Sequence, residues 1–281
     1  MIGFMFNFEF ARIRLEFLAV YNFESKYLIG QVFNGILNRN LKNLVCLKPD
    51  EKSCEGCKFL NVCPYIKIAS TDIIPTQFSK YALKPYPNSN KIEDGTTFCL
   101  DITLLGKTLD YWEFVLNAFP KTIRFKNSIF VLKNAYFYNP IEEKYFPIKS
   151  SIQKFESKNL LQSKTNKDTL KITVYPAYLT YVKNNTLDKD SFARLVLSRV
   201  YTVAQDFGIV TRRLYVDSES FYIKEIHFEP IKLDIFSKNQ PLEGYILLEG
   251  DLSNIYPYLK ILENISIGKF TTSGFGNIVL S

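Results

Sequence analysis

The sequence predicts an α+β fold in which one β-α-β-β-α-β unit occurs twice. In each half, segments with the two-residue apolar period of strands and segments with the three-to-four-residue period of helices follow one another in this order. A lysine-rich stretch separates the halves, and 281 residues are enough for two domains. The order is that of the ferredoxin-like (RRM-like) fold. We therefore expect an N-terminal ferredoxin-like domain at 1–148, a basic linker at 149–170 and a C-terminal ferredoxin-like domain at 171–281.

The first half begins with a long predicted strand over residues 3–18. Phenylalanines alternate with other residues up to Phe10 and apolar residues continue from Ile13, so the phase shifts near Ala11 and predicts a bulge. Apolar residues of the next segment, 30–45, share one helical face. The remaining expected elements are strands at 97–105 and 128–138 and a helix at 109–119.

Between the first helix and the next strand, residues 46–94 contain cysteines and prolines with little periodicity. We interpret this range as an inserted segment with its own local fold. The alternative that one further strand lies at 81–84 stays open.

The second half shows clearer boundaries. Asp188 is expected to cap a helix that runs to Phe207 and ends at Gly208. A second helix is expected to start at Asp251 or Ser253 and to continue through Leu262. The predicted strands are 171–181, 221–236 with a kink at Pro230, its hairpin partner 242–249, and 266–280.

Composition limits the function classes. The formal net charge of +7 fits a nucleic-acid partner, although many other proteins share it. No apolar run approaches the roughly 20 residues of a membrane span, and charges such as Glu9 and Arg12 interrupt the apolar start where a signal peptide would have none. We therefore expect a cytoplasmic protein with no membrane contact.

The run Ile267-Gly-Lys-Phe-Thr-Thr-Ser-Gly-Phe-Gly-Asn-Ile278 precedes the end of the chain. Glycines permit positive φ and close approach of a ligand, and exposed backbone N–H groups with hydroxyl and ammonium donors suit phosphate oxygens. No helix is expected after it, which excludes a Walker loop and a dinucleotide fingerprint. The alternative is an ordinary glycine-rich turn. The candidate RNA-binding residues here are Gly268, Lys269, Thr271, Thr272, Ser273, Gly274 and Gly276.

Three segments together resemble a known family. They are residues 29–42 (IGQVFNGILNRNLK), the cysteine segment 54–65 (CEGCKFLNVCPY), and 244–280, where a Gly244 hairpin precedes the glycine run. In this order they resemble the RAMP superfamily. More closely, they resemble the CRISPR repeat-RNA processing endoribonucleases of the sixth Cas family, in the branch with a cysteine-containing insertion. The chain departs from that pattern at Ser266 and Asn34, where many members have glycine and arginine.

The resemblance implies a metal-independent endoribonuclease that cuts CRISPR precursor RNA within repeats. The ribose 2′-OH attacks the adjacent phosphorus and a 2′,3′-cyclic phosphate results. It also implies repeat RNA and other Cas proteins as partners, no cofactor for catalysis, and RNA contact by Arg39. Active members place a histidine in the N-terminal half, whereas His227 is the one histidine here. His227 and Lys42 are the candidate catalytic residues, since imidazole titrates near neutrality and an ammonium can stabilise developing charge.

The cysteine segment has a spacing compatible with a metal site. Cys54, Cys57 and Cys63 lie within ten residues, and Cys46 is a fourth candidate ligand. Structural zinc is the first choice and an iron–sulfur cluster the second, with reduced packing thiols as the alternative. Two functional alternatives also stay open. One is a non-catalytic RNA-binding RAMP subunit of a CRISPR effector complex, and the other is a ferredoxin-like metalloprotein unrelated to RNA.

Overall fold

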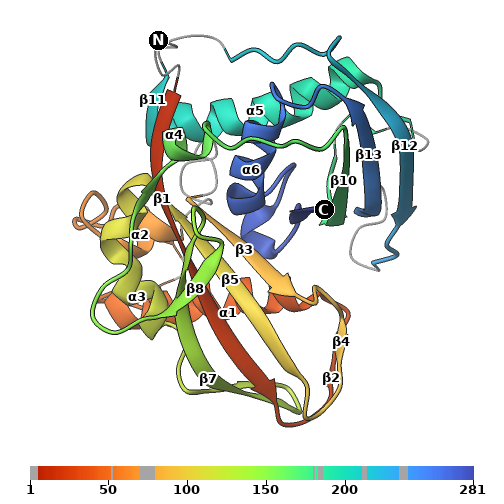
Figure 1. The fold of residues 1–281 in the computed structure, drawn as a ribbon. Helices are drawn as coiled ribbons and strands as arrows, with labels where there is room; N and C mark the ends of the chain where they lie inside the picture. The colour runs from red at the N-terminus through yellow and green to blue at the C-terminus, as the bar shows by residue number, and fades with distance from the viewer. Residues whose placement is uncertain are drawn as a thin grey trace.

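A computed structural model describes residues 6–51, 53–69, 80–179, 181–182, 186–210, 214–233 and 240–281. The chain forms two large antiparallel sheets with helices packed against them, and confirms the predicted tandem ferredoxin-like α+β fold (Figure 1). None of the helices in the described ranges has the length and apolar character needed to cross a bilayer.

The first sheet has the strand order β3-β5-β1-β7-β6, and the four strands from β3 to β7 follow the ferredoxin-like order. The bounds are β1 Phe6–Ala19, β3 Tyr81–Tyr86, β5 Thr97–Leu105, β6 Thr122–Phe125 and β7 Ser128–Asn139. The open alternative of a strand near 81–84 is confirmed as β3. One strand of the first sheet, β3, therefore lies inside the range 46–94 that was assigned to the insertion.

Helices and short strands complete this half. Helix α1 spans Ile29–Val45, α2 Pro64–Ile68 and α3 Trp112–Asn117. The predicted helix at 109–119 is a 3₁₀ turn, η1 Gly106–Tyr111, followed by α3. The short strands are β2 Phe23–Glu24 with β4 Lys91–Ile92, and β8 Lys144–Pro147 beside β7.

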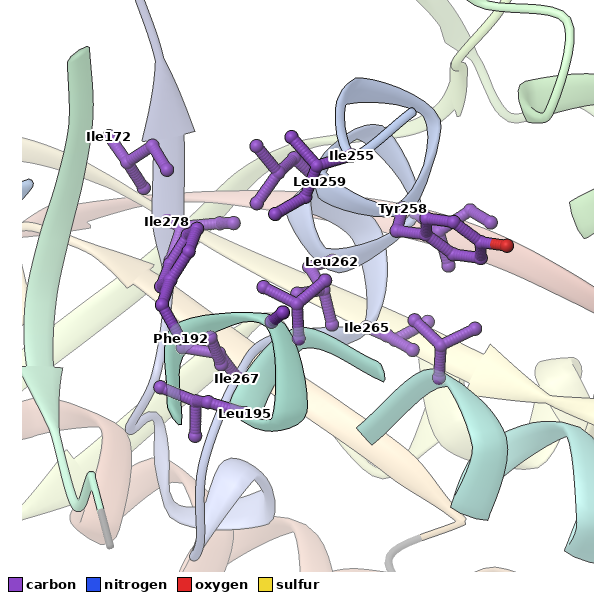
Figure 2. Packing of buried hydrophobic residues seen from close by; sticks show 14 of the residues in the cluster. Ile172, Phe192, Leu195, Ile255, Tyr258, Leu259, Leu262, Ile265, Ile267 and Ile278 are labelled. Atoms are coloured by element: carbon purple, nitrogen blue, oxygen red, sulfur yellow. The ribbon is translucent and has the colours of Figure 1, made fainter. Parts of the chain in front are cut away.

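The second sheet has the order β12-β13-β10-β14, again the ferredoxin-like order. Its strands are β10 Thr169–Ala177, β12 Phe221–Pro230, β13 Leu242–Gly250 and β14 Ile278–Leu280. Helices α5 Lys189–Phe207 and α6 Tyr256–Ile265 pack on it. In Figure 2, Leu259 and Leu262 of α6 lie in the same cluster as Phe192 of α5 and Ile278 of β14.

Several predicted helix boundaries are confirmed and others are wrong. The Asp188 carboxylate accepts a hydrogen bond from the Ser191 N–H, and α5 ends at Gly208, as expected. Helix α6 begins after Ile255, which has no side-chain cap, so neither Asp251 nor Ser253 caps it. The last strand contains three residues, because the preceding ones form a folded loop.

Strand β1 serves both halves. Phe6, Phe8 and Phe10 are buried in the core of the second half, whereas Ala11 and every second residue after it are buried in the core of the first. The phase shift seen in the sequence thus marks the place where one strand passes from one core to the other (Figure 1). The irregularity in its pairing lies between Glu16 and Phe17, opposite β7, rather than near Ala11.

The stretch expected to be a basic linker contains packed structure. It holds β9 Phe155–Glu156, which pairs with β1, and the short helix α4 Ser157–Leu160. Phe155 and Leu160 are buried in the core of the second half. A further short strand, β11 Gly208–Val210, also pairs with the start of β1. The two halves are therefore joined by backbone pairing as well as by the chain.

The carboxyl end of α6 is held by side chains from both halves. The backbone carbonyl of Glu263 accepts from the Lys84 side-chain nitrogen, that of Asn264 from the Thr103 hydroxyl at 2.7 Å, and that of Ile265 from the Arg199 guanidinium at 3.1 Å. A helix leaves its last carbonyls without intrahelical partners, and its negative end favours cations. Lys84 and Thr103 come from β3 and β5, so this helix end joins the second half to the first sheet.

Replacing Lys84 with methionine tests this buried contact. Burial lowers the pKa of Lys84 well below its ordinary value of 10.5, so between the two values the unfolded chain binds a proton that the folded chain lacks. The free energy of unfolding of the wild type minus that of the variant should therefore increase as pH rises through this window to 10.5. The increase should be at most about 1.4 kcal/mol per pH unit. Urea denaturation across pH measures the difference.

The exposed Lys133→Met variant is the control for this experiment. Its free energy of unfolding should follow that of the wild type at every pH. A Lys84→Met difference that does not change with pH would contradict the assignment.

Candidate functional site

The glycine-rich run forms a compact loop between α6 and β14. Five of its residues have positive φ, and a single 3₁₀ turn, η2 Thr271–Ser273, lies at its centre. Those residues are Ser266, Gly268, Phe270, Gly274 and Gly276. The Ile267 N–H donates to the Gly276 carbonyl at 2.8 Å and closes the base of the loop. The expectation of a long final strand is therefore wrong in this range, because alternating left-handed residues cannot continue a strand.

The glycines of this loop face protein. A Cβ on Gly274 would lie 2.9 Å from the Gly30 Cα on α1, and a Cβ on Gly30 would lie 2.8 Å from the Ser273 carbonyl oxygen. A Cβ on Gly268 would lie 2.5 Å from the Tyr178 carbonyl oxygen. The absence of side chains thus serves close packing within the chain, rather than space for a ligand at these positions.

Polar side chains connect the loop to the first half. Asn88 donates to the Gly274 carbonyl at 2.8 Å and accepts from the Gly30 N–H at 3.3 Å. Asn34, one turn along α1, accepts from the Tyr81 hydroxyl at 2.6 Å, and its amide lies 3.4 Å from the Ser273 hydroxyl. The loop is therefore seated on the first turns of α1. Sequence reasoning missed Asn88 and Tyr81, whose partners lie far away along the chain.

The outer edge of the loop is formed by Lys269 and Phe270. Both side chains are exposed, 53% in the case of Phe270, and the Phe270 ring packs edge-on against Tyr178 at 5.1 Å between centroids. Thr272 and Ser273 are half-buried. Thr271 is buried and accepts from the Arg199 guanidinium at 3.1 Å, so its hydroxyl already has a partner in the protein. An ammonium, an aromatic ring and hydroxyls on one edge suit a phosphate and a base.

The predicted α1 residues lie further along the helix, away from the seat of the loop. The Lys42 ammonium donates to the Glu51 carbonyl, three residues before the cysteine segment, and Arg39 is exposed. Lys42 is eight residues, about 12 Å of helix, beyond Asn34. The structure therefore places Lys42 beside the insertion.

His227 is on β12, the edge strand of the second sheet. Its imidazole is exposed, lies 3.3 Å from a Glu229 carboxylate oxygen, and stands 5.7 Å from the Tyr245 ring between centroids. The contacts of His227 are thus with Glu229 and Tyr245, whereas Lys42 contacts Glu51. The N-terminal half contains no histidine, because His227 is the one histidine of the chain.

The four candidate metal-ligating cysteines line one cavity of about 560 Å³, namely Cys46, Cys54, Cys57 and Cys63. Burial raises the pKa of the Cys54 thiol; Lys42 opposes this shift, and the other three thiols add to it. Within the described ranges, no three histidine, cysteine or acidic residues stand in a metal-binding arrangement. Cys99 lies on β5, outside the cavity.

Comparison with known proteins gives the following likenesses. The family AF_1859_N, an N-terminal domain, matches residues 8–129. No curated protein matches the chain by sequence. Among solved structures, a Cas6 product complex is similar at 12% identity, over 97% of this chain and 99% of that chain, with a TM-score of 0.57.

Two further structures are similar in fold. A chain of a Cas6-RT-Cas1–Cas2 complex has 12% identity and a TM-score of 0.62, over 100% of this chain and 29% of that one. A RAMP protein binding different RNA substrates has 13% identity and a TM-score of 0.51, over 96% and 99%. At these identities the likeness concerns the fold, and at that level the predicted resemblance to Cas6 and RAMP proteins is confirmed.

The close approach of the loop to α1 can be tested with two glycines of similar φ. Gly274 (φ 85°) faces the Gly30 backbone, whereas a Cβ on Gly56 (φ 75°) would meet no atom within 4 Å. We expect Gly274→Ala to lower the free energy of unfolding by about 2–4 kcal/mol, from left-handed strain plus overpacking, and Gly56→Ala by about 1 kcal/mol, from strain alone. Urea denaturation of both variants measures this. Equal losses would show that the close approach contributes nothing.

Proposed function

We propose that this protein is a CRISPR precursor-RNA processing endoribonuclease, which binds repeat RNA across the junction of α1 and the glycine-rich loop. The observation that carries the proposal is the loop seated on α1 between two ferredoxin-like units, with Lys269 and Phe270 exposed on its edge. Support also comes from the fold likeness to Cas6 proteins, one in a product complex, and to a RAMP protein binding RNA substrates.

The proposed reaction is attack of a ribose 2′-OH on the adjacent phosphorus. The 2′-oxygen forms a bond to phosphorus, the bond to the 5′-oxygen breaks, and the 2′ proton passes to a base while the 5′-oxygen gains a proton. Lys269 would stabilise charge on the phosphoryl oxygens, and Ser273 would hold the strand. Because the His227 imidazole lies beside Glu229 on its own strand, we propose that alignment of the substrate and charge stabilisation give most of the rate, without an imidazole base. Lys42 and Arg39 would contact the strand further along α1.

The second candidate is an RNA-binding RAMP subunit that does not cut. One observation favours it, since the single histidine is exposed on β12 and lies beside Glu229. Both candidates take repeat RNA as ligand and other Cas proteins as partners, and they differ in turnover.

Incubation with labelled repeat RNA in EDTA separates the two. We expect cleavage to continue in EDTA, since the mechanism needs no metal, and to stop when the 2′-OH at the cut site is replaced by hydrogen. The products should carry 2′,3′-cyclic phosphate ends, seen by their resistance to 3′ end-labelling until acid opens the ring and a phosphatase then removes the resulting monophosphate. Cutting of the 2′-deoxy substrate would exclude the mechanism.

Two variants refine the outcome. His227→Ala should cleave at the wild-type rate, whereas Lys269→Met should lower the rate by about 10²-fold, if one charge donor is lost. Tight, salt-sensitive binding without product in any condition would favour the non-catalytic subunit. Absence of repeat-RNA binding would favour the metalloprotein alternative.

We also propose that the cysteine cavity holds a structural zinc ion. Four thiols from Cys46, Cys54, Cys57 and Cys63 are the donor set that tetrahedral zinc takes, and all four line one cavity. The ion would hold the cysteine segment against the end of α1 and would take no part in RNA cleavage. Binding would draw the thiols inward as thiolates.

Metal content tests this second proposal. Protein purified without chelator should contain about one zinc ion per chain, as measured by inductively coupled plasma mass spectrometry. Cys54→Ser with Cys57→Ser should abolish the zinc, and Cys99→Ser should retain it as the matched control. Absence of zinc and iron from wild-type protein, even after refolding with either metal, would contradict a metal role.

A further inference from the structure

A second large cavity lies at the interface between the two halves. Its volume is about 530 Å³, within the range of small-ligand sites, and it shares no lining residue with the glycine-rich loop or the cysteine cavity. Three parts of the chain form it: helix α2 of the insertion, the 3₁₀ turn η1, and the turn from α5 into β11. Its described charged residues are Lys67, Lys80, Lys107 and Asp206, and we name it the lysine pocket.

The charges of this pocket are unbalanced. Lys80 is half-buried, and its ammonium donates to the Ile66 carbonyl at 2.5 Å. Burial lowers the pKa of Lys80, and repulsion from Lys67 lowers it further. A bound anion would relieve both effects, because it would replace lost solvation and screen the repulsion.

The described acid of the pocket does not cancel these charges. Asp206 lies close enough to Arg199 to act on it: burial lowers the pKa of that guanidinium to about 10, and Asp206 opposes the fall. Its carboxylate is therefore shared with a buried cation of α5. Three lysines therefore line the cavity with one acid, which also acts on Arg199.

We propose that the lysine pocket binds a phosphate group, carried by an RNA strand or by a free nucleotide. The volume of about 530 Å³ would hold a nucleotide-sized ligand, and the lysines on α2 (Lys67), just before β3 (Lys80) and on η1 (Lys107) could contact phosphate oxygens from several sides. The Asn61 amide adds a neutral polar group to the lining, whereas the Thr108 hydroxyl is already hydrogen-bonded to the backbone of Leu105 and Lys80. A ligand there would touch the insertion and both ferredoxin-like units. Binding of an RNA phosphate in this pocket rests on the proposed function, whereas binding of a free nucleotide is independent of it.

The test uses a double variant, Lys67→Met with Lys107→Met, which removes two charges and keeps the apolar stems. Lys80 is left in place because its ammonium holds the Ile66 carbonyl. The matched control is Lys133→Met with Lys144→Met, an equal change at two exposed lysines outside the pocket. The full-length protein is used throughout.

In the first arm, AMP and inorganic phosphate are added and the melting temperature is measured. In the second, anisotropy of labelled single-stranded repeat RNA is followed against salt concentration. An RNA occupant predicts that the pocket variant lowers the salt slope by about 1.4, at ~0.7 per phosphate contact, and weakens binding roughly tenfold at ~0.1 M salt. A nucleotide occupant predicts a rise in melting temperature with AMP that the pocket variant loses and the control keeps.

Either result supports the pocket and identifies the source of the phosphate. If wild type, pocket variant and control agree in both arms, the proposal is overturned. If no form of the protein binds RNA, the proposed RNA function fails, and the AMP arm alone decides on the pocket.

Discussion

The end of helix α6 is the contact on which the arrangement of the two halves depends. Its last three carbonyls accept from Lys84, Thr103 and Arg199, which belong to two strands of the first sheet and to α5. Ser266 follows immediately with a φ of 64° and turns the chain into the glycine-rich loop. The direction of the loop is thus set by a helix end that both halves hold, and its contact with α1 follows from this.

Charge is buried beside that contact. Asp101 on β5 is fully buried, and burial alone would raise its pKa, yet Arg12 and Arg14 on β1 bring the pKa below its ordinary value. The Arg14 guanidinium also stacks over the Tyr145 ring at 3.8 Å. Buried ion pairs add little net stability compared with apolar packing, but an unpaired buried charge is costly. The cluster therefore favours one register of β1 against β5 over any shifted one.

Features that depend on residues close together in the sequence could be predicted, whereas contacts between residues far apart in the sequence could not. The alternation of β1, the Asp188 cap and the Gly208 end each depend on neighbouring residues, and the structure has them. The predicted start of α6 is too early. Asp251 and Ser253 are suitable capping residues, but the helix begins after the buried Ile255. The packing of the loop against α1 depends on the close approach of Gly30 and Gly274, which are 244 positions apart. No periodicity of the sequence predicts such a pair.

This distant pairing changes how the glycines are understood. From the sequence alone, Gly268, Gly274 and Gly276 suggest open backbone for a ligand, but in the fold the space beside each is filled by protein backbone. Packing holds the loop backbone in one shape, so Lys269, Phe270, Thr272 and Ser273 leave it at fixed positions and little backbone entropy is left to lose on binding. Recognition would then come from the residues between the glycines. The glycines would contribute by keeping that edge fixed on α1.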